Sequence, residues 1–284
     1  MITYLKGDML NSPAQVLVNT VNTVGVMGKG IALQFKNKYP EMFRAYQKMC
    51  DEKTLDIGKL CIWKKEDKWI LLFPTKRHWR NPSKMEYIKE GLDKFQKHAN
   101  RLGIESIAFP KLGCGNGGLD WEEVRPIMEH YLEPLSIKVY IYIDSLTKEK
   151  PEHENITDIE MWLKNNPEFI GFEMLKQDLK QYLNSNKTIN TLNGNSFEVK
   201  WIEDIIEIDD GKILSFNENV FCEFWNYVRD VGIVNLNDIP MEFQEGLNYM
   251  VELLGTLKYV EPVIISKSGK IHDEAISGYQ YIGV

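Results

Sequence analysis

The stretch from Val16 to Lys36, VLVNTVNTVGVMGKGIALQFK, constrains the fold of this chain more than any other part of the sequence. It opens with the aliphatic run Val16–Val18, which is typical of a strand covered on both faces. It ends with apolar residues at helical spacing, Ile31–Phe35, followed by lysines. The crossing between them is rich in glycine, which lets backbone N–H groups and a helix N-terminus meet an anion. The sequence therefore predicts a phosphate or ribose loop, with a turn that merely needs glycine as the alternative.

Two well-known phosphate-loop motifs do not describe this crossing. Gly28-Lys29 is followed by Gly30, where a P-loop needs Ser or Thr, and the glycine spacing is not that of the dinucleotide fingerprint. A second loop, residues 111–118, does carry the letters of that fingerprint, but it comes late in the chain, which argues against a dinucleotide site. Because this loop lies between a predicted strand and a helix capped by Asp120, it is still predicted to cradle a diphosphate.

Strands and helices alternate along residues 1–146, which predicts an α/β domain. Within it, Ser83 is predicted to cap a helix over residues 83–102, with Glu86 three places later completing a capping box. The segment 147–155 is charged and poor in apolar residues, and it is interpreted as a linker.

A second domain is predicted over residues 156–284, and its pattern differs from that of the first. Two helices lead into a predicted hairpin, Phe197–Ile208 with Ile213–Phe216, that turns at Asp209-Asp210-Gly211. Further helices and two strands follow, which together indicate an α+β domain.

Cysteine and histidine usage argues against a metal site, and no cofactor is expected. The four cysteines and five histidines are scattered without metal-ligand spacing, which indicates a protein of the reducing cytoplasm. No apolar run approaches the roughly 20 residues of a membrane span, and the first residues do not resemble a signal peptide. No histidine is placed by the sequence to activate Cys114, so a small packed thiol is favoured there over a nucleophile.

The net charge of -7 conceals two halves of opposite sign. Residues 1–150 hold 24 basic and 18 acidic side chains, a balance of +6, and the remainder holds 10 and 23, a balance of -13. A basic first half can approach a polyanion, whereas the second half suits a basic partner. Uneven solvation of two ordinary surfaces is the alternative.

Three motifs in order, Lys6-Gly7-Asp8, Val18–Asn22 and Phe109–Gly115, make residues 1 to about 144 resemble a macrodomain, the ADP-ribose-binding module. The resemblance implies a three-layer α/β/α fold with a mixed sheet, in which Asp8 holds the adenine amino group. It further implies that the two glycine loops clasp the diphosphate and the distal ribose. The ADP-ribose contacts that it implies are Asp8, Met9, Asn19, Asn22, Gly28, Lys29, Gly30, Ile31, Ala32, Thr75, Gly113, Cys114, Gly115, Asn116, Gly117, Gly118 and Leu119.

Within macrodomains the chain is most similar to the branch of the terminal ADP-ribose glycohydrolase and the DarG antitoxins. This branch carries a catalytic lysine in a Thr-Lys context, which Thr75-Lys76 matches, so the resemblance implies Lys76 as the catalytic residue. The glycohydrolase has an Asp two places after its Gly-Cys-Gly, where this chain has Gly117. Lys76 can attack the anomeric carbon, or it can stabilise or protonate the leaving group, and the sequence leaves both open.

DarG proteins reverse the action of DarT, a toxin that attaches ADP-ribose to thymidine in single-stranded DNA. The resemblance therefore implies ADP-ribosylated single-stranded DNA as substrate and a DarT-type ADP-ribosyltransferase toxin as partner. Residues 74–82, PTKRHWRNP, interleave cations with a ring, which suits single-stranded nucleic acid and makes Arg77, His78, Trp79 and Arg80 candidate DNA contacts. The acidic second domain is predicted to inhibit the toxin by imitating DNA phosphates with its carboxylates, which are those of Glu203, Asp204, Glu207, Asp209, Asp210, Glu218, Glu223 and Asp230. A non-catalytic ADP-ribose reader, or a hydrolase of modified protein or RNA, remains the alternative.

Overall fold

The computed structural model describes residues 1–66, 68–143, 151–154, 156–166, 169–191, 194–235, 240, 243, 246–266 and 275–281. The chain divides into two compact units, Met1–Glu160 and Met161–Val284. Residues 144–150 and Asn155, which include most of the predicted linker 147–155, lie outside the described residues. The predicted boundaries at 146 and 156 remain predictions.

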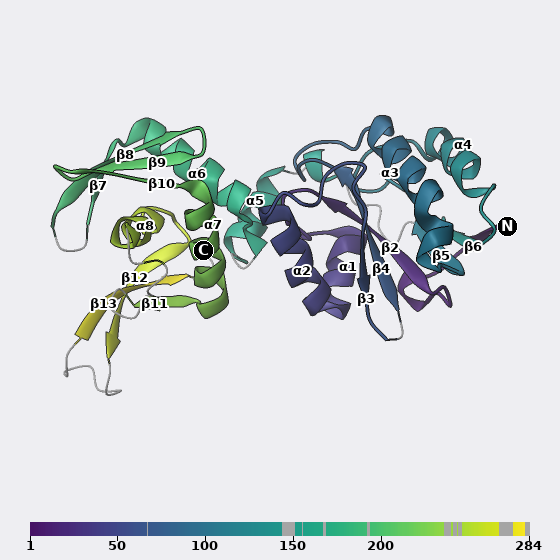
Figure 1. Ribbon diagram of the computed structural model, residues 1–284, viewed down its shortest axis with the longest axis horizontal. Coiled ribbons are helices and arrows are strands. Elements are labelled where there is room, and N and C mark those ends of the chain that lie inside the picture. Colours follow the sequence, from purple (N-terminus) through teal and green to yellow (C-terminus); the bar gives the residue numbers. More distant parts are fainter. Residues whose placement is uncertain are drawn as a thin grey trace. The chain divides into compact units, whose positions relative to one another are not determined.

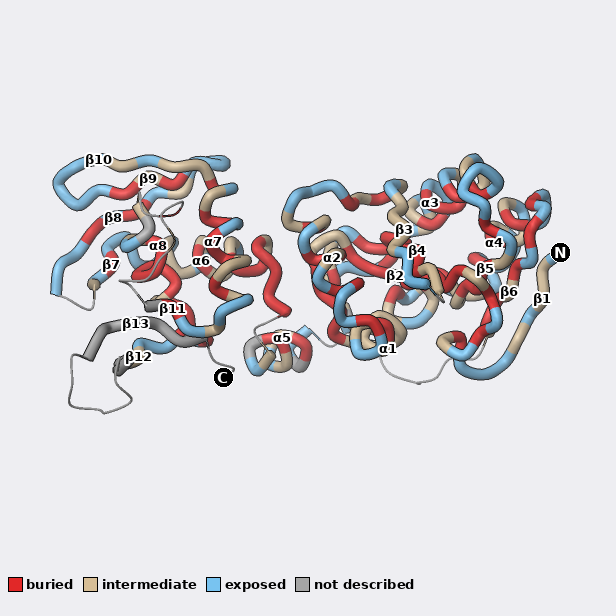
Figure 2. The backbone as a smooth tube through the Cα atoms, turned by 60° about the horizontal axis from the view of Figure 1, so that its bottom comes forward, coloured by how far each residue is buried: buried red, intermediate tan, exposed pale blue. Residues whose placement is uncertain are grey.

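The first unit is built on a six-stranded mixed sheet in the order β1-β6-β5-β2-β4-β3. Its central strands β2 and β5 are uncharged and mostly buried, as expected for a sheet covered on both faces (Figure 2). Only β3 runs antiparallel to its neighbour, at the edge of the sheet. The strands are β1 Ile2–Leu5, β2 Val16–Asn22, β3 Cys61–Lys64, β4 Trp69–Lys76, β5 Ser106–Pro110 and β6 Lys138–Tyr142.

Helices cover both faces of this sheet, as Figure 1 shows. On one face α3 and α4 bury Ile88, Leu92 and Met128 against β2, β4, β5 and β6 in one apolar cluster. Figure 1 shows α1 and α2 together beside the other face, where Phe35 and Met42 are fully buried. The predicted three-layer α/β/α architecture is confirmed. The helices are α1 Gly30–Lys38, α2 Pro40–Asp51, α3 Met85–His98 and α4 Trp121–Leu132, with 3-10 turns at Met9–Asn11 and Ala99–Leu102.

The two predicted helix caps in this unit have different outcomes. Asp120 caps α4 as predicted, since its carboxylate accepts a hydrogen bond from the Glu122 N–H at 2.9 Å. The predicted capping box at Ser83 is wrong, because α3 begins after Lys84 without a side-chain cap. Ser83 instead donates its backbone N–H to the Gly117 carbonyl and is buried against the second glycine loop.

The second unit has an α+β composition with two antiparallel sheets, one ordered β10-β9-β8-β7 and the other β11-β13-β12. Phe197, Val199, Ile206 and Ile208 alternate along β8 and β9 and are buried, which is the pattern of a sheet with one solvated face. Its strands are β7 Thr188–Asn190, β8 Ser196–Ile202, β9 Ile205–Asp209, β10 Ile213–Asn217, β11 Ile233–Asn235, β12 Val260–Ser266 and β13 Ala275–Tyr281. Its helices are α6 Phe172–Ser185, α7 Glu218–Val231 and α8 Leu247–Leu254, and α5 Ile156–Lys164 spans the boundary with the first unit.

The single strand predicted over Phe197–Ile208 is wrong, because two strands occupy this stretch. A two-residue turn at Glu203-Asp204 separates β8 from β9, and Glu203 adopts a φ of 53° there. The predicted turn at residues 209–211 lies between β9 and β10. None of the helices in the described ranges is long and apolar enough to cross a membrane.

Candidate ADP-ribose site in the first unit

A pocket of about 350 Å³ opens where the parallel strands of the first unit end. Loops that follow the carboxyl ends of parallel strands form ligand crevices in open α/β sheets. Of the predicted site residues, those that line the pocket are Met9, Asn22, Lys29, Gly30, Ile31, Ala32, Thr75, Lys76, Gly113, Gly115, Asn116 and Gly117. Both predicted glycine loops and the predicted lysine therefore meet at one cavity.

The first glycine loop is organised by the side chain of Asn22 at the end of β2. Its Oδ1 accepts hydrogen bonds from the N–H groups of Val24 and Val26 and from the Tyr46 hydroxyl. Its Nδ2 donates to the Val26 carbonyl at 2.7 Å. These contacts fold the chain back on itself, so that the pocket-lining residues from Val26 to Gln34 face the cavity. Asn22 thus lines the pocket, but its side-chain amide is engaged in hydrogen bonds with Val24, Val26 and Tyr46.

Lys76 reaches the pocket because β4 is irregular at its end. The register with β2 shifts between Val21 and Asn22, whose partners are Pro74 and Lys76, so Thr75 forms a bulge. Pro74 is tolerated because β3 pairs with β4 only as far as Leu72. The Lys76 side chain is 5% exposed and its Nζ donates to the Asn116 carbonyl at 2.6 Å. A bulge therefore places a buried ammonium group beside the second glycine loop.

The second glycine loop is packed too tightly for a side chain at Gly117. A Cβ there would lie 2.3 Å from the Gly113 carbonyl oxygen and 2.3 Å from the Ser83 Oγ. The two loops also touch each other, because a Cβ on Gly30 would lie 2.6 Å from the Asn116 Nδ2. Gly30 moreover has a φ of +57°. The glycines at these two positions are required by close approach and backbone conformation.

Six predicted ligand residues do not line the pocket. Asp8 lies on the segment between the lining residues Gly7 and Met9, where its carboxylate accepts from the Leu10 N–H. Asn19 is fully buried and its Nδ2 points to the Met27 sulfur at 3.7 Å. The other predicted residues outside the lining are Gly28, Cys114, Gly118 and Leu119.

The Cys114 thiol is not activated. Burial raises its pKa to about 12, with a smaller opposing effect of Lys111. A thiol with so high a pKa is almost wholly protonated at neutral pH and is a poor nucleophile. This agrees with a packing role for Cys114.

The predicted DNA contacts after β4 are mostly engaged within the protein. The prediction that the Trp79 ring stacks on a base is wrong, because the side chain is fully buried under Arg80, whose guanidinium lies 4.7 Å from the ring centre. Arg77 is more than half exposed and forms an ion pair with Asp56 at 3.0 Å. Arg80 forms an ion pair with Glu160 at 2.7 Å. Sequence reasoning could not foresee these partners, which lie 21 and 80 residues away in the chain.

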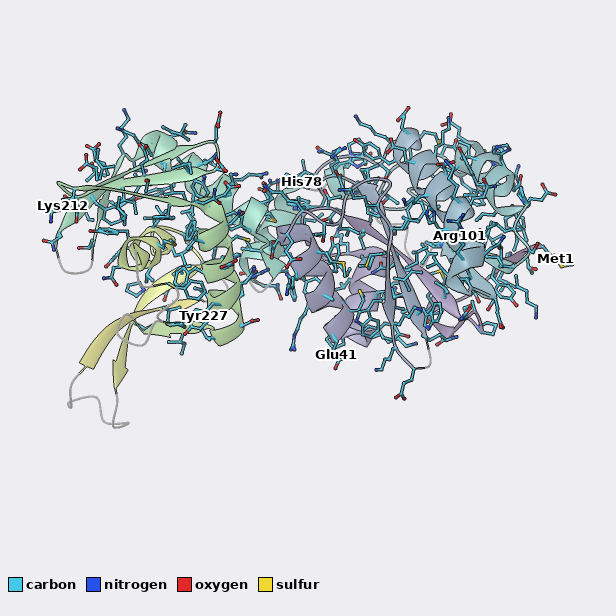
Figure 3. All side chains as sticks on the ribbon, in the orientation of Figure 1. Met1, Glu41, His78, Arg101, Lys212 and Tyr227 are labelled. Atoms are coloured by element: carbon cyan, nitrogen blue, oxygen red, sulfur yellow. The ribbon has the colours of Figure 1, made fainter. Side chains whose placement is uncertain are left out.

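His78 is half-buried, as Arg80 is, and Figure 3 labels its side chain. Burial, aided by the charges of Arg80 and Lys76, lowers its pKa to about 4. Its Nδ1 accepts a hydrogen bond from the Arg80 N–H, so the neutral ring carries its proton on Nε2.

Because the folded protein keeps His78 neutral, we expect the first unit to become less stable in mild acid. The folded-state pKa lies below the unfolded value of about 6.5, so the unfolded chain binds a proton first as the pH falls. Stability is therefore full above pH ~6.5 and is lost progressively down to pH ~4, by roughly 2–3 kcal/mol. Urea unfolding of the wild type and of His78→Gln across this range, with an NMR titration of the ring, measures the effect. Equal pH dependence in the two proteins would contradict it.

Sequence reasoning missed several residues that line the pocket. Lys111 adds a third lysine beside Lys29 and Lys76, and Tyr142 closes the cavity at the end of β6. Lys111 was detectable, since it directly precedes the second glycine loop, whereas Tyr142 is brought in only by the pairing of β6 with β1 and β5. The other missed residues are Gly7, Thr20, Val21, Val26, Leu33, Gln34 and Pro110. Among the described residues, no group of three or more His, Cys, Asp or Glu side chains is arranged to hold a metal ion.

Comparison with known proteins places this pocket in a family. The Macro domain model matches residues 18–128. A solved structure, the macrodomain of Mycobacterium tuberculosis DarG, is 50% identical and superposes with a TM-score of 0.50, covering 51% of this chain and 99% of that one. This chain belongs to the macrodomain family. Its macrodomain is of the DarG type.

Two further relatives of the DarG-type macrodomain are similar over the same part of the chain. A DNA ADP-ribosyl glycohydrolase of Thermus aquaticus is 45% identical over 147 residues, which are 50% of this chain and 41% of that protein. Thermosipho africanus DarTG, solved in complex with ADP-ribose, is 42% identical with a TM-score of 0.50, covering 53% of this chain and 43% of that one. The chain thus spans about two-fifths of the length of these relatives.

Proposed function

We propose that this chain is a DNA ADP-ribosyl glycohydrolase that removes ADP-ribose from thymidine in single-stranded DNA. The observation that carries the proposal is the burial of Lys76 in the pocket, between two glycine loops suited to a diphosphate. A module that only holds ADP-ribose has no need of an ammonium group at this place. The relative from Thermus aquaticus is named a DNA ADP-ribosyl glycohydrolase, and one from Thermosipho africanus is named a DNA ADP-ribosyl transferase-DNA ADP-ribosyl glycohydrolase fusion protein. Both names support the removal of ADP-ribose from DNA.

In this proposal Lys76 acts at the anomeric carbon of the distal ribose. Cleavage of the bond from ribose to the base nitrogen passes through an oxocarbenium-like state in which negative charge develops on the departing base. The ammonium group can stabilise or protonate that base, and as a neutral amine it can attack the carbon. The Asn116 carbonyl orients the Nζ for either role.

ADP-ribose binding is proposed to use the groups that surround the pocket. Backbone N–H groups at Gly30–Ala32 and at Gly113–Gly117 would hold the diphosphate, with Lys29 and Lys111 adding positive charge. Asp8 is proposed to meet the adenine amino group at the Gly7–Met9 edge. Asn19 and Asn22 are proposed to act through the shape of the first loop, near the distal ribose.

Substrate comparison tests this function against its alternatives. Release of ADP-ribose is measured from ADP-ribosylated thymidine in single-stranded DNA, from ADP-ribosylated guanosine in RNA and from a glutamate-modified protein. The proposal expects the thymidine substrate to be cleaved fastest. Faster cleavage of the protein or RNA substrate would favour those alternatives, and ADP-ribose binding without release from any substrate would favour a reader.

The second unit is proposed to bind and inhibit a basic DarT-type toxin by imitating DNA phosphates. Carboxylates are exposed along the solvated face and turns of its four-stranded sheet, at Glu198, Glu203, Asp204, Asp209 and Asp210. Glu198 and Asp209 lie directly opposite each other on β8 and β9. Like charges in this arrangement destabilise a sheet, and a cationic partner would relieve the repulsion.

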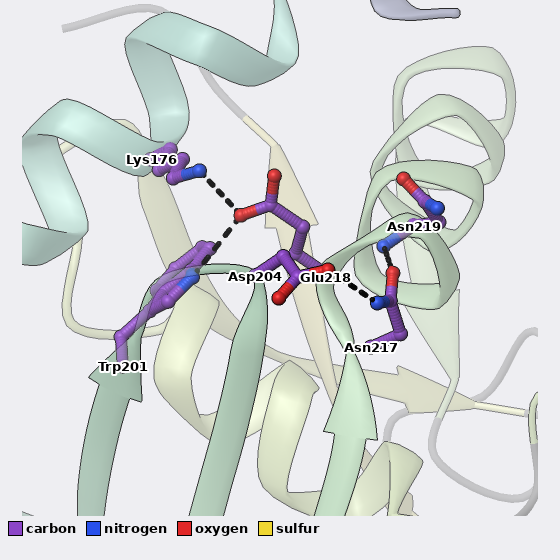
Figure 4. Close-up of polar contacts among 6 residues, drawn as sticks. All are labelled: Lys176, Trp201, Asp204, Asn217, Glu218 and Asn219. Atoms are coloured by element: carbon purple, nitrogen blue, oxygen red, sulfur yellow. Dashed lines mark hydrogen bonds and ion pairs between the residues drawn. The ribbon is translucent and has the colours of Figure 1, made fainter.

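Glu218, which was predicted from the sequence to be among the carboxylates that imitate DNA phosphates, does not belong to the solvated face of the four-stranded sheet. Figure 4 shows its carboxylate between Lys176 and the Trp201 indole nitrogen, and the side chain is buried. An acid that is paired inside the unit cannot imitate an exposed phosphate. The neighbouring Asp204 is exposed and accepts a hydrogen bond from Asn217 at 3.0 Å (Figure 4).

We expect Glu198→Gln to stabilise the second unit slightly and to weaken toxin binding. Glu198 and Asp209 are like charges at facing positions, so removing one of them should raise the free energy of unfolding by about 0.2–1 kcal/mol. Toxin binding should weaken, because the proposed DNA-binding groove of the toxin loses a carboxylate partner. Calorimetry with a DarT-type toxin and urea unfolding measure the two effects. Glu261→Gln, an exposed acid on β12, is the matched control. Unchanged toxin affinity in Glu198→Gln would contradict the proposed surface.

A further inference from the structure

A short segment after the macrodomain's last strand packs on the second glycine loop. Residues Glu152–Glu154 form a 3-10 turn that carries His153. The His153 Cε1 lies 2.8 Å, and its Nε2 3.4 Å, from the position that a Cβ on Gly118 would take. The imidazole therefore contacts the bare Cα of Gly118, where the φ of +78° also favours glycine. The His153 Nδ1 is buried and has no hydrogen-bond partner among the described residues, so packing places this ring.

The same segment is tied to the loop that follows Lys76. Glu160, on the first turns of α5, forms a 2.7 Å ion pair with Arg80, and both side chains are only about one-third exposed. A single partly shielded pair of this kind stabilises a contact more than a fully exposed one does. The described residues 151–154 and 156–160, which carry these two contacts, are called the strap below. The compact first unit ends at Glu160 and so includes it.

The two loops that the strap contacts are the ones that position the lysine. Gly118 donates its N–H to the Gly115 carbonyl and Leu119 donates to the Gly113 carbonyl, which closes the loop around Asn116. The Asn116 carbonyl in turn accepts from the Lys76 Nζ. Arg80 lies four residues after Lys76 on the chain. A shift of the loop at Gly118 would therefore move the acceptor that orients the ammonium group.

We propose that His153 and Glu160 are positioning residues of the glycohydrolase site, and that the strap holds the second glycine loop and the Lys76 loop in register. This inference rests on the proposed function, because it assigns the strap to the same lysine. Groups that orient catalytic side chains from behind control rate strongly, since misplacement by about 1 Å can cost as much as 100-fold. His153, in the predicted linker, and Glu160, in the predicted second domain, then both belong to the catalytic unit.

The test uses the full chain with His153→Ala and with His153→Gln, whose flat amide retains the contact with Gly118. Amide exchange of Gly118 and Leu119 is followed by NMR, and single-turnover release of ADP-ribose is followed beside ADP-ribose affinity. We expect His153→Ala to speed exchange of these two amides about tenfold, and to lower the rate about tenfold more than the affinity. His153→Gln should restore most of both. His98→Ala, at the end of α3, is the control and should change neither.

A second variant protects the test against a folding defect. Glu160→Gln removes the ion pair with Arg80 and keeps the side-chain shape, and it should lower the rate by about threefold to tenfold with the affinity nearly unchanged. If His153→Ala leaves the amide exchange of Gly118 and Leu119 unchanged, the strap does not hold the second glycine loop. This outcome overturns the proposal whether or not the wild type releases ADP-ribose. Faster exchange with an unchanged rate, in an active wild type, overturns the positioning role. Absence of release by the wild type contradicts the proposed function alone, and the exchange measurement still decides whether the strap holds the loop.

Discussion

Lys76→Ala is expected to lower the release of ADP-ribose from thymidine by on the order of 10²–10⁴-fold, with the affinity for ADP-ribose nearly unchanged. The reason is that, in the proposed function, the Lys76 ammonium group meets the substrate where charge develops during cleavage, whereas the pocket-lining loops supply most of the ground-state binding. Single-turnover kinetics on a modified oligonucleotide and calorimetry with ADP-ribose measure the two quantities separately.

The matched control is Lys89→Ala, which removes an exposed lysine from α3. It should leave both the rate and the affinity at their wild-type values. A Lys76→Ala protein with full activity would refute the catalytic assignment. Equal losses of rate and of affinity would instead make Lys76 a binding residue, as in a reader.

Gly117→Asp is expected to disable the site, although the terminal ADP-ribose glycohydrolase that the sequence resembles has an aspartate two places after its Gly-Cys-Gly. Any Cβ here would lie 2.3 Å from both the Gly113 carbonyl and the Ser83 Oγ. The loop must then shift, which should lower the free energy of unfolding by about 1–3 kcal/mol and abolish measurable ADP-ribose binding. Gly117→Ala should do nearly the same, because the Cβ alone makes the clash.

Two further variants sharpen this prediction. Adding Ser83→Gly to Gly117→Ala should not restore binding, because the backbone clash with Gly113 remains. Gly115→Ala has no atom within 4 Å of its Cβ and should retain wild-type thermal stability. Normal stability and ADP-ribose affinity in Gly117→Ala would show that the loop adapts freely, contrary to this account.

The elements that position the site could largely be predicted because their signals are local. The uncharged run at Val16–Val18 and the glycines at the first loop predicted the strand and the crossing. Asp120 predicted the start of α4 through its short polar side chain. The order of the motifs then predicted that Lys76 and both loops share one pocket, as the structure shows.

The remaining features depend on contacts between distant parts of the chain. The Arg77 pairing with Asp56 and the burial of Trp79 follow from how the loop after β4 folds onto its surroundings, which composition does not reveal. Ser83 has the chemistry of a helix cap, yet it packs on Gly117 instead. In the second unit, the turn at Glu203-Asp204 interrupts a stretch that was predicted as one strand. Asp is a common turn residue, but no Gly or Pro stands beside it here, so the apolar pattern on both sides appeared continuous.

The most direct test of the central claim is a crystal structure of the chain with ADP-ribose. The account predicts the diphosphate between the loops at Gly30–Ala32 and Gly113–Gly117, with the anomeric carbon of the distal ribose within about 3.5 Å of the Lys76 Nζ. A ligand bound elsewhere on the chain, or a distal ribose beyond the reach of Lys76, would contradict it.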